Sequence, residues 1–208
     1  MKAAMARRSR LLAALANLAL FSASPTAAMA AEPARELIVA DFDSGRKPNN
    51  LGGDFGCWIK DPDDPAQGCI EAFDPTNRHG TKGNALRIIY SVESNKPAFG
   101  GLWMRLQNLD ATRFDRLAFR VKGDAGMGYT GTFKVELKDA MDVSSHYYVR
   151  GITDRWQDVT ISLKDFEGMA NPKKLKEFVI VIEDTTATAK QGVLYLDDVR
   201  FTRSAPGS

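Results

Sequence analysis

The strand-like segment Leu102–Leu106 presents an aromatic ring and a cation to solvent. Successive side chains of a β-strand point to opposite faces, so the alternation of this segment directs its aliphatic side chains into the core. Trp103 and Arg105 then point away from the core. Sugars pack their C–H groups on flat aromatic faces, while planar polar groups at the edge read their hydroxyls. The pair therefore predicts a sugar-binding platform; the alternative is that Trp103 packs beneath the long segment 44–84.

Two adjacent tyrosines and three charged residues extend this predicted surface. Neighbouring strand residues alternate in direction, so Tyr147 and Tyr148 cannot both face the core, and one of them is displayed. Trp58 either lines a pocket or anchors its loop, and we favour the anchor; Trp156 is expected to be a structural aromatic at the start of a strand. The predicted ligand-binding residues are Trp103, Arg105, Tyr147, Tyr148, Lys134, Glu136 and Arg87.

The sequence lacks the short motifs that carry catalysis. It contains no Gly-x-Ser-x-Gly, no His-Glu-x-x-His and no phosphate-binding glycine loop, and His79 and His146 are far apart. Glycoside hydrolysis needs two facing carboxylates, for which Glu136 with Asp139 is the nearest approximation. We interpret Glu136 as a solvent-facing acid between lysines. The sequence predicts a protein that is not an enzyme.

The first thirty residues have the pattern of a secretory signal peptide. Arginines within residues 7–10 precede an apolar run over residues 11–21, and Ala-Met-Ala at 28–30 is the small-x-small pattern cleaved by signal peptidase. The run is too short to span a membrane, which takes roughly 20 apolar residues. We therefore expect export to the periplasm or the extracellular space, with no membrane span once residues 1–30 are removed.

The charge of the mature chain limits its partners. Removing residues 1–30 takes away four cationic residues and no acids, so the formal charge changes from +2 to −2. Nucleic acids and anionic membranes require a concentrated basic patch, whereas the basic residues here are scattered. The expected partner is a carbohydrate or an exported protein, and not a nucleic acid.

Cys57 and Cys69 are the only cysteines of the chain. In an oxidising compartment, two cysteines at this spacing are predicted to form a disulfide. Closing a loop of this length stabilises a fold by about 3 kcal/mol in the chain-entropy model. Metal ligation is the alternative, but no histidine lies at the spacing of a zinc site.

Alternating apolar and polar residues predict an all-β sandwich of jelly-roll type with about nine strands. Single helical turns are expected within 165–169 and 171–177. The predicted strands cover residues 37–42, 85–90, 102–106, 116–121, 132–137, 147–152, 156–163, 178–183 and 193–201.

Residues 44–84 interrupt this pattern and are rich in Gly, Pro, Asp and Asn. We interpret them as a long, ordered, disulfide-containing loop after the first strand, because so long a loop in a compact domain is usually functional. The expected organisation is a signal peptide over 1–30, one sandwich domain over 31–203 and a flexible tail over 204–208.

Short motifs along residues 36–202 resemble a known family. Their order is similar to that of the galactose-binding-like jelly rolls, in particular the carbohydrate-binding modules of family 11. It also resembles the related domain of the complex I intermediate-associated protein. The motifs are Ile38-Val-Ala-Asp-Phe-Asp43, His79-Gly-Thr-Lys-Gly-Asn-Ala-Leu-Arg87, Phe99-Gly-Gly-Leu-Trp103, Asp154-Arg-Trp-Gln-Asp-Val-Thr-Ile-Ser-Leu-Lys-Asp-Phe166 and Gly192-Val-Leu-Tyr-Leu-Asp-Asp-Val-Arg-Phe201.

The resemblance also implies a structural calcium ion that joins the first strand, a loop and the last strand. Its side-chain ligands would be Asp43 and Asp198, and its backbone carbonyl ligands would come from around Gly80 and Lys82. Ca²⁺ takes several hard oxygen ligands of both kinds. Alternatively, the two aspartates satisfy backbone groups at strand ends.

The resulting hypothesis is an exported, non-catalytic module that binds a poly- or oligosaccharide on a sheet face. A protein-interaction or assembly factor on the same fold is the alternative, in which the outward aromatic ring anchors an interface. A polysaccharide hydrolase or lyase is the third hypothesis, and it requires two carboxylates about 5 to 9 Å apart in a cleft.

Overall fold

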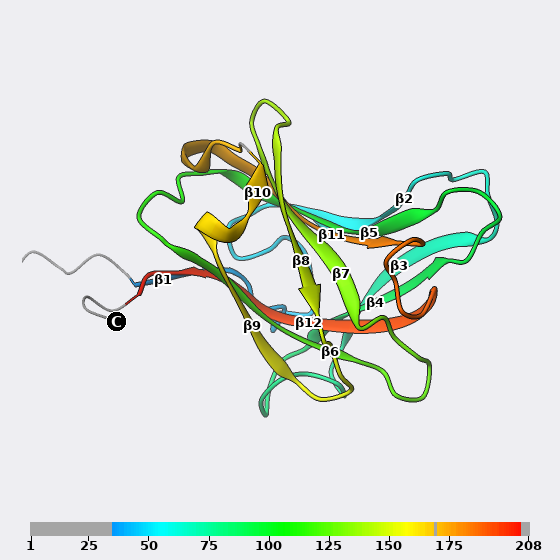
Figure 1. Cartoon of the computed structure of the whole chain (residues 1–208). Coiled ribbons are helices and arrows are strands. Elements are labelled where there is room, and N and C mark those ends of the chain that lie inside the picture. The colour runs from blue at the N-terminus through cyan, green and yellow to red at the C-terminus, as the bar shows by residue number, and fades with distance from the viewer. Residues whose placement is uncertain (1–34, 169, 205–208) are drawn as a thin grey trace, which may run out of the picture. The chain divides into compact units, whose positions relative to one another are not determined.

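The computed structural model describes residues 35–168 and 170–204, which form two six-stranded antiparallel sheets packed as a β-sandwich (Figure 1). The jelly-roll prediction is confirmed. The predicted signal peptide and residues 205–208 lie outside the described residues. Ser204, the expected first residue of a flexible tail, donates its backbone N–H to the Asp115 carboxylate and is held against the domain. Within the described ranges, no helix has the length and apolar character to cross a membrane.

The strands divide into two sheets, which we call sheet A and sheet B. Along sheet A the order is β3 (Gln67–Asp74), β4 (Ala85–Val92), β12 (Gln191–Thr202), β6 (Arg116–Gly123) and β9 (Gln157–Ser162). A sixth strand, β1 (Glu36–Ala40), also pairs with β12. Along sheet B the order is β10 (Glu167–Gly168), β8 (Ser144–Arg150), β7 (Thr132–Asp139), β11 (Leu175–Glu183), β5 (Phe99–Leu109) and β2 (Phe55–Ile59).

Period-two alternation explains why each sheet has one buried face. In β7, every second residue from Phe133 is buried, and the residues between them are partly exposed. The inner faces meet in one core, where Phe119 of sheet A lies 6.3 Å from Phe133 and 6.0 Å from Phe178 of sheet B, measured between ring centroids. Burying one such side chain stabilises the fold by about 1.5 to 3 kcal/mol. The opposite faces of both sheets remain available for loops or ligands.

The prediction that residues 44–84 form a long loop was wrong. This segment contains β2 and β3, which are the edge strands of the two sheets, and together with β10 they raise the described strands from about nine to twelve. Gly56 and Gly68 stand within these strands and interrupt the apolar alternation. Short strands with glycine inside them resemble loops in sequence, because glycine weakens the strand signal.

The two expected helical turns occur as single 3-10 turns. The second is Pro172–Lys174, and the Asn171 side chain caps it by accepting from the backbone N–H of Lys173 at 3.0 Å. The first is Leu163–Asp165, which ends where we had expected it to begin, and β10 follows it. The position of the first turn was therefore partly wrong.

Candidate functional site

The outer face of sheet B carries side chains of five neighbouring strands in register. Val179 of β11 lies between Trp103 of β5 and Glu136 of β7. One pair further along, Val181 lies between Gly101 and Lys134. Aromatic rings therefore occupy the β2–β5 side of this face, and charged groups occupy the β7–β11 side.

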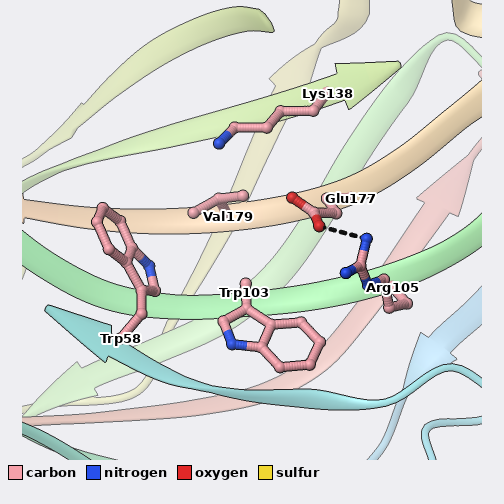
Figure 2. A pocket seen from close by; sticks show the side chains of 6 residues that line it. All are labelled: Trp58, Trp103, Arg105, Lys138, Glu177 and Val179. Carbon is pink, nitrogen blue, oxygen red and sulfur yellow. Dashed lines mark ion pairs between the residues drawn. The ribbon is translucent and has the colours of Figure 1, made fainter. Parts of the chain in front are cut away.

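Two adjoining hollows make this face concave. Trp58 and Lys138 line both hollows, so we treat them as one feature, the sheet-B groove. The first has a volume of about 310 Å³ and is lined by Trp58, Trp103, Arg105, Lys138, Glu177 and Val179 (Figure 2). The second has a volume of about 490 Å³ and is lined by Trp58, Phe99, Lys134, Glu136, Lys138, Val181 and Glu183.

Two glycines make room for the tryptophans. Gly56 of β2 lies opposite Trp103, and a Cβ atom at Gly56 would stand 3.4 Å from the indole ring, which lies across this strand. Gly101 of β5 lies opposite Trp58. Its φ is +155°, and a Cβ atom there would come within 2.0 Å of the Ile180 carbonyl oxygen, so only glycine fits. Opposite Trp58, β5 therefore presents bare backbone.

The aromatic side of the groove is partly exposed. Trp103 is half-buried, and the Arg105 guanidinium lies 5.4 Å from its ring centre. Trp58 extends from β2 across β5 towards Val179 and meets Phe99 edge-on, with ring centres 5.7 Å apart (Figure 2). The indole N–H of Trp58 is buried and has no hydrogen-bond partner among the described residues. Trp103 is thus a wall of an open groove and is not sealed beneath the 44–84 segment.

The charged side of the groove is a set of ion pairs. Arg105 contacts Glu177 at 2.6 Å, and Lys134 contacts Glu136 at 3.0 Å and Glu183 at 2.7 Å. Burial alone would lower the pKa of Lys134, but the hydrogen bonds that it donates to Glu183 and Glu136 outweigh burial and raise the pKa. Lys134 therefore remains a cation that joins two strands of the groove.

The two predicted tyrosines separate as alternation requires. Tyr148 faces outward beside Lys134 and donates its hydroxyl to Glu183 at 2.9 Å. Tyr147 instead packs against the core and lies 6.1 Å from the Phe166 ring centre. Of this pair, Tyr148 is the residue at the groove.

Arg87 does not lie at the groove, so the prediction that its strand neighbours those of Lys134 and Glu136 was wrong. It lies on β4 of sheet A, opposite Tyr195, and its guanidinium contacts the Met127 sulfur at 3.0 Å. Its outward orientation was predicted correctly, but it faces outward from the other sheet. Alternation gives the direction of a side chain and does not say in which sheet its strand lies.

Comparison with known proteins places this geometry in a structural context. No family model and no curated protein matches the sequence. A family 11 carbohydrate-binding module from Clostridium thermocellum, in complex with a β-1,3-1,4-mixed-linked tetrasaccharide, superposes with a TM-score of 0.61 at 12% identity, over 81% of this chain and 96% of that one. The chain has the jelly-roll fold of the family 11 modules.

Two further neighbours share the sandwich of the family 11 fold. A family 30 carbohydrate-binding module matches with a TM-score of 0.53 at 18% identity, over 73% of this chain and 86% of that one. An exo-β-agarase matches with a TM-score of 0.59 at 11% identity, over 81% of this chain but 25% of that one. The fold therefore occurs both as a module and as one part of an enzyme, and these low identities establish the fold alone.

Sequence reasoning missed part of the groove in this family 11-like sandwich. Glu177, Val179, Val181 and Glu183 are alternate residues of β11 and lie on its outer face together, but the continuous apolar run over residues 178–182 hides this alternation in the sequence. Trp58 was interpreted as a loop anchor because β2 was not recognised. The remaining residues that were missed are Phe99 and Lys138.

The proposed calcium ligands gather at the β1 end of the family 11-like fold. Gly83 packs against Asp43, since a Cβ atom there would lie 1.7 Å from the carboxylate oxygen, so the loop holding Gly80 and Lys82 passes beside Asp43. Burial, and then the charges of Asp41 and Asp198, raise the pKa of Asp43. The predicted neighbourhood of Asp43, the loop and Asp198 is therefore present.

An arginine also lies among these acidic groups. The Arg120 guanidinium forms an ion pair with Asp198. Asp197 accepts the backbone N–H of His79 at 3.0 Å, and burial raises its pKa to about 7. Within residues 35–168 and 170–204, no three acidic, His or Cys side chains gather as metal ligands. Calcium binding stays a prediction, which calorimetric titration of the wild type and Asp43→Asn with Ca²⁺ tests.

The two cysteines are adjacent and free in this structure. Their sulfur atoms lie 2.7 Å apart, on the inner side of β2 and β3. The contact with Cys69, and then burial, raise the pKa of the Cys57 thiol, so Cys57 is protonated at neutral pH. The predicted disulfide stays a prediction.

Proposed function

We propose that the protein binds a neutral poly- or oligosaccharide in the sheet-B groove and does not cleave it. The observation that carries this proposal is the pairing of two half-buried indole rings, Trp58 and Trp103, with a rim of hydrogen-bonding charged groups across one open groove. Sugars need both parts at once, because each ring carries an apolar C–H face and polar hydroxyl edges.

The rim favours hydroxyl groups over charged ligands. Three cations and three carboxylates line the groove, and they are paired with one another. A hydroxyl can donate to a carboxylate or accept from a cation without breaking these pairs. An anionic sugar such as a uronate would have to take a cation from its partner and leave that carboxylate unpaired beside a like charge. The buried N–H of Trp58 adds a donor that lacks an acceptor.

The same ion pairs support a role without catalysis. A glycosidase needs one carboxylic acid that donates a proton and a second carboxylate on the other side of the bond. Here Glu136 and Glu183 both bind the ammonium group of Lys134, and Glu177 binds Arg105. The complex of the Clostridium thermocellum module with a tetrasaccharide shows that this fold binds sugar chains in a protein of similar length, which supports the proposal.

Affinity electrophoresis through gels that contain a polysaccharide tests this function. The panel contains soluble β-1,3-1,4-glucan, a neutral mannan, a neutral xyloglucan and an anionic pectate. We expect retardation by at least one neutral gel and none by pectate. Trp103→Ala should abolish retardation, and the matched control Ile70→Ala, which removes a side chain 63% exposed on the opposite sheet, should leave it unchanged.

Failure across all neutral gels at millimolar sugar would refute the proposal. Co-purification of one stoichiometric exported protein in that case would favour the interaction factor instead. Export itself is part of the proposal, and N-terminal sequencing of the protein recovered from outside the cytoplasm, with residue 31 expected first, tests it.

A further inference from the structure

The cysteine pair lies where the two sheets meet beside the groove. β2 is an edge strand of sheet B, and β3 is an edge strand of sheet A. Because they belong to different sheets, no β-ladder joins them. Cys57 and Cys69 bring the two strands together through their sulfur atoms, 2.7 Å apart. The sulfurs thus form a point of contact across the open side of the sandwich.

The other contacts across this side are side-chain contacts. The backbone N–H of Cys57 donates to Glu71 at 2.8 Å, and Glu71 also binds Lys47 at 3.0 Å. The Phe55 and Phe73 rings meet edge-on at 6.1 Å. Each contact of this kind contributes little to the stability of the fold, since a partly exposed ion pair is worth about 1 kcal/mol or less. A covalent link would be the strongest restraint at this side.

The same short strand carries the aromatic wall of the groove. Gly56 and Trp58 flank Cys57, and their side of β2 faces the groove while the cysteine faces inward. Among the described residues, β2 pairs with β5 on one edge and has no strand on the other. An edge strand of five residues frays more readily than a central one. Any opening of β2 therefore moves Trp58.

We propose that Cys57 and Cys69 are oxidised to a disulfide that clamps β2 to β3 and thereby holds Trp58 in place for ligand binding. The inference rests on the proposed function of the groove. The two thiols lose two protons and two electrons, and the oxidant is another disulfide, either small-molecule or protein-borne, that is reduced to two thiols. The S–S bond forms through a mixed disulfide, and the sulfurs need only a small approach to the bonded distance of about 2.0 Å.

The clamp acts on binding through preorganisation. In the oxidised protein the indole of Trp58 is already in its binding position, whereas in the reduced protein the ligand must order β2 and this ring. We expect affinity to weaken about fivefold on reduction, the order expected for immobilising one side chain and part of its strand. The melting temperature should fall by roughly 5 to 10 °C, because a short covalent loop is lost.

The test compares wild type treated with glutathione disulfide, wild type treated with a phosphine reductant, and the double variant Cys57→Ala/Cys69→Ala. Thiol counting should find no free thiol in the first and two in the second. Binding is measured by calorimetry with soluble β-1,3-1,4-glucan, or with whichever neutral polysaccharide retards the protein. Hydrogen exchange of the β2 amides is followed in parallel. The double variant should match the reduced wild type and ignore the reductant.

Three outcomes separate the inference from the function. If two free thiols persist after oxidation, or if affinity and β2 exchange are equal in the oxidised and reduced states, the clamp is refuted while the groove can still bind sugar. If the oxidised protein shows a protected β2 but binds no neutral polysaccharide, the groove function fails. The hydrogen-exchange readout needs no ligand, and the reduced wild type replaces the double variant if that variant does not fold.

Discussion

The outer faces of the two sheets carry similar residues and differ in what lies over them. On sheet B, Trp58 and Trp103 stand beside lysine, arginine and glutamate and line an open groove. On sheet A, Trp156 and Tyr195 stand beside Lys122, whose ammonium lies 5.9 Å and 5.0 Å from their ring centres. A composition of rings and cations is therefore common to both faces.

The β3–β4 connection, residues 75–84, covers the rings of sheet A. Asn77 donates to the Tyr195 hydroxyl at 3.1 Å and accepts from Lys122 at 2.9 Å. His79 meets the Trp156 ring edge-on at 5.9 Å. The Tyr195 hydroxyl donates in turn to Asp124, and only 2% of the residue is exposed. The polar groups beneath this connection bind one another, which leaves them few free positions for hydrogen bonds to a ligand.

The comparison teaches that an outward aromatic residue becomes a binding surface only where the chain does not cover it. Polar groups already paired beneath a loop stabilise the fold, whereas rings at an open groove remain available for a partner. We therefore expect substitutions on sheet A to change stability and substitutions in the groove to change affinity.

The largest contrast should come from a matched pair of tryptophan substitutions. Trp58→Ala removes a wall shared by both hollows and should weaken polysaccharide binding at least about tenfold, as loss of a central aromatic contact does. Trp156→Ala should lower the melting temperature and leave the affinity unchanged. Calorimetry and thermal unfolding of both variants check this, and equal losses of affinity would remove the distinction between the two faces.

A matched pair of tyrosine substitutions should give the next largest difference, in unfolding free energy. Tyr195→Phe removes the hydrogen bonds that its hydroxyl makes with Asn77 and Asp124, and should cost about 1 to 2 kcal/mol of unfolding free energy. Tyr148→Phe, at the edge of the groove, should cost less than about 0.5 kcal/mol. Urea unfolding measures both, and a larger cost for Tyr148→Phe would contradict the assignment of the covered face.

Substitutions of a cation should also cost more unfolding free energy on the covered face than at the groove, but the costs should be smaller. Lys122→Gln loses its bond to Asn77 and its contact with two rings, and should cost about 1 kcal/mol. Arg105→Gln breaks a pair whose arginine side chain is 42% exposed, and should cost less than about 0.5 kcal/mol. Chemical denaturation with and without 0.5 M salt, at which the screening length is about 4 Å, tests the ranking; reversal of the order would count against it.

The smallest effect is the contribution of Tyr195, on the covered face, to the pH dependence of stability. Burial, and then the hydrogen bond to Asp124, raise the pKa of Tyr195 from 10.0 to about 12. The folded protein holds this proton more tightly than the unfolded chain, so the stability from Tyr195 is complete below pH 10 and is lost as the pH rises towards 12. Wild type should therefore lose unfolding free energy more steeply over this range than Tyr195→Phe, and parallel profiles would exclude the effect.

Local alternation was sufficient to predict the sandwich and nine of its strands. It also predicted that Trp103, Arg105, Lys134 and Glu136 face outward, and the structure places all four at one groove. It could not predict strand order, which depends on pairing between residues far apart in sequence, and Arg87 was misplaced for that reason. Whether a loop covers a face is equally non-local.

Residues 44–84, which were wrongly predicted to be a loop, contain the strand that completes the groove. Gly56 and Trp58 on β2 would have joined the predicted site had the strand been recognised. The glycines that hide β2 and β3 from a pattern of apolar alternation are tolerated there because both are edge strands. Trp58 was therefore left out of the predicted site because β2 was not recognised as a strand.

The bare backbone at Gly101 has a consequence for how this surface can change. No other residue fits at that position, so a substitution at Gly101 would displace the adjoining strand and, with it, Trp58. Selectivity for a different chain of sugars is more readily altered from the borders, through Arg105, Lys134 or Lys138, whose long side chains can be shortened or exchanged at little cost to the sheet. Gly101 is thus fixed by the sheet while the residues at the borders of the groove can vary, and a directed-evolution experiment for new sugar selectivity should accumulate substitutions at those borders.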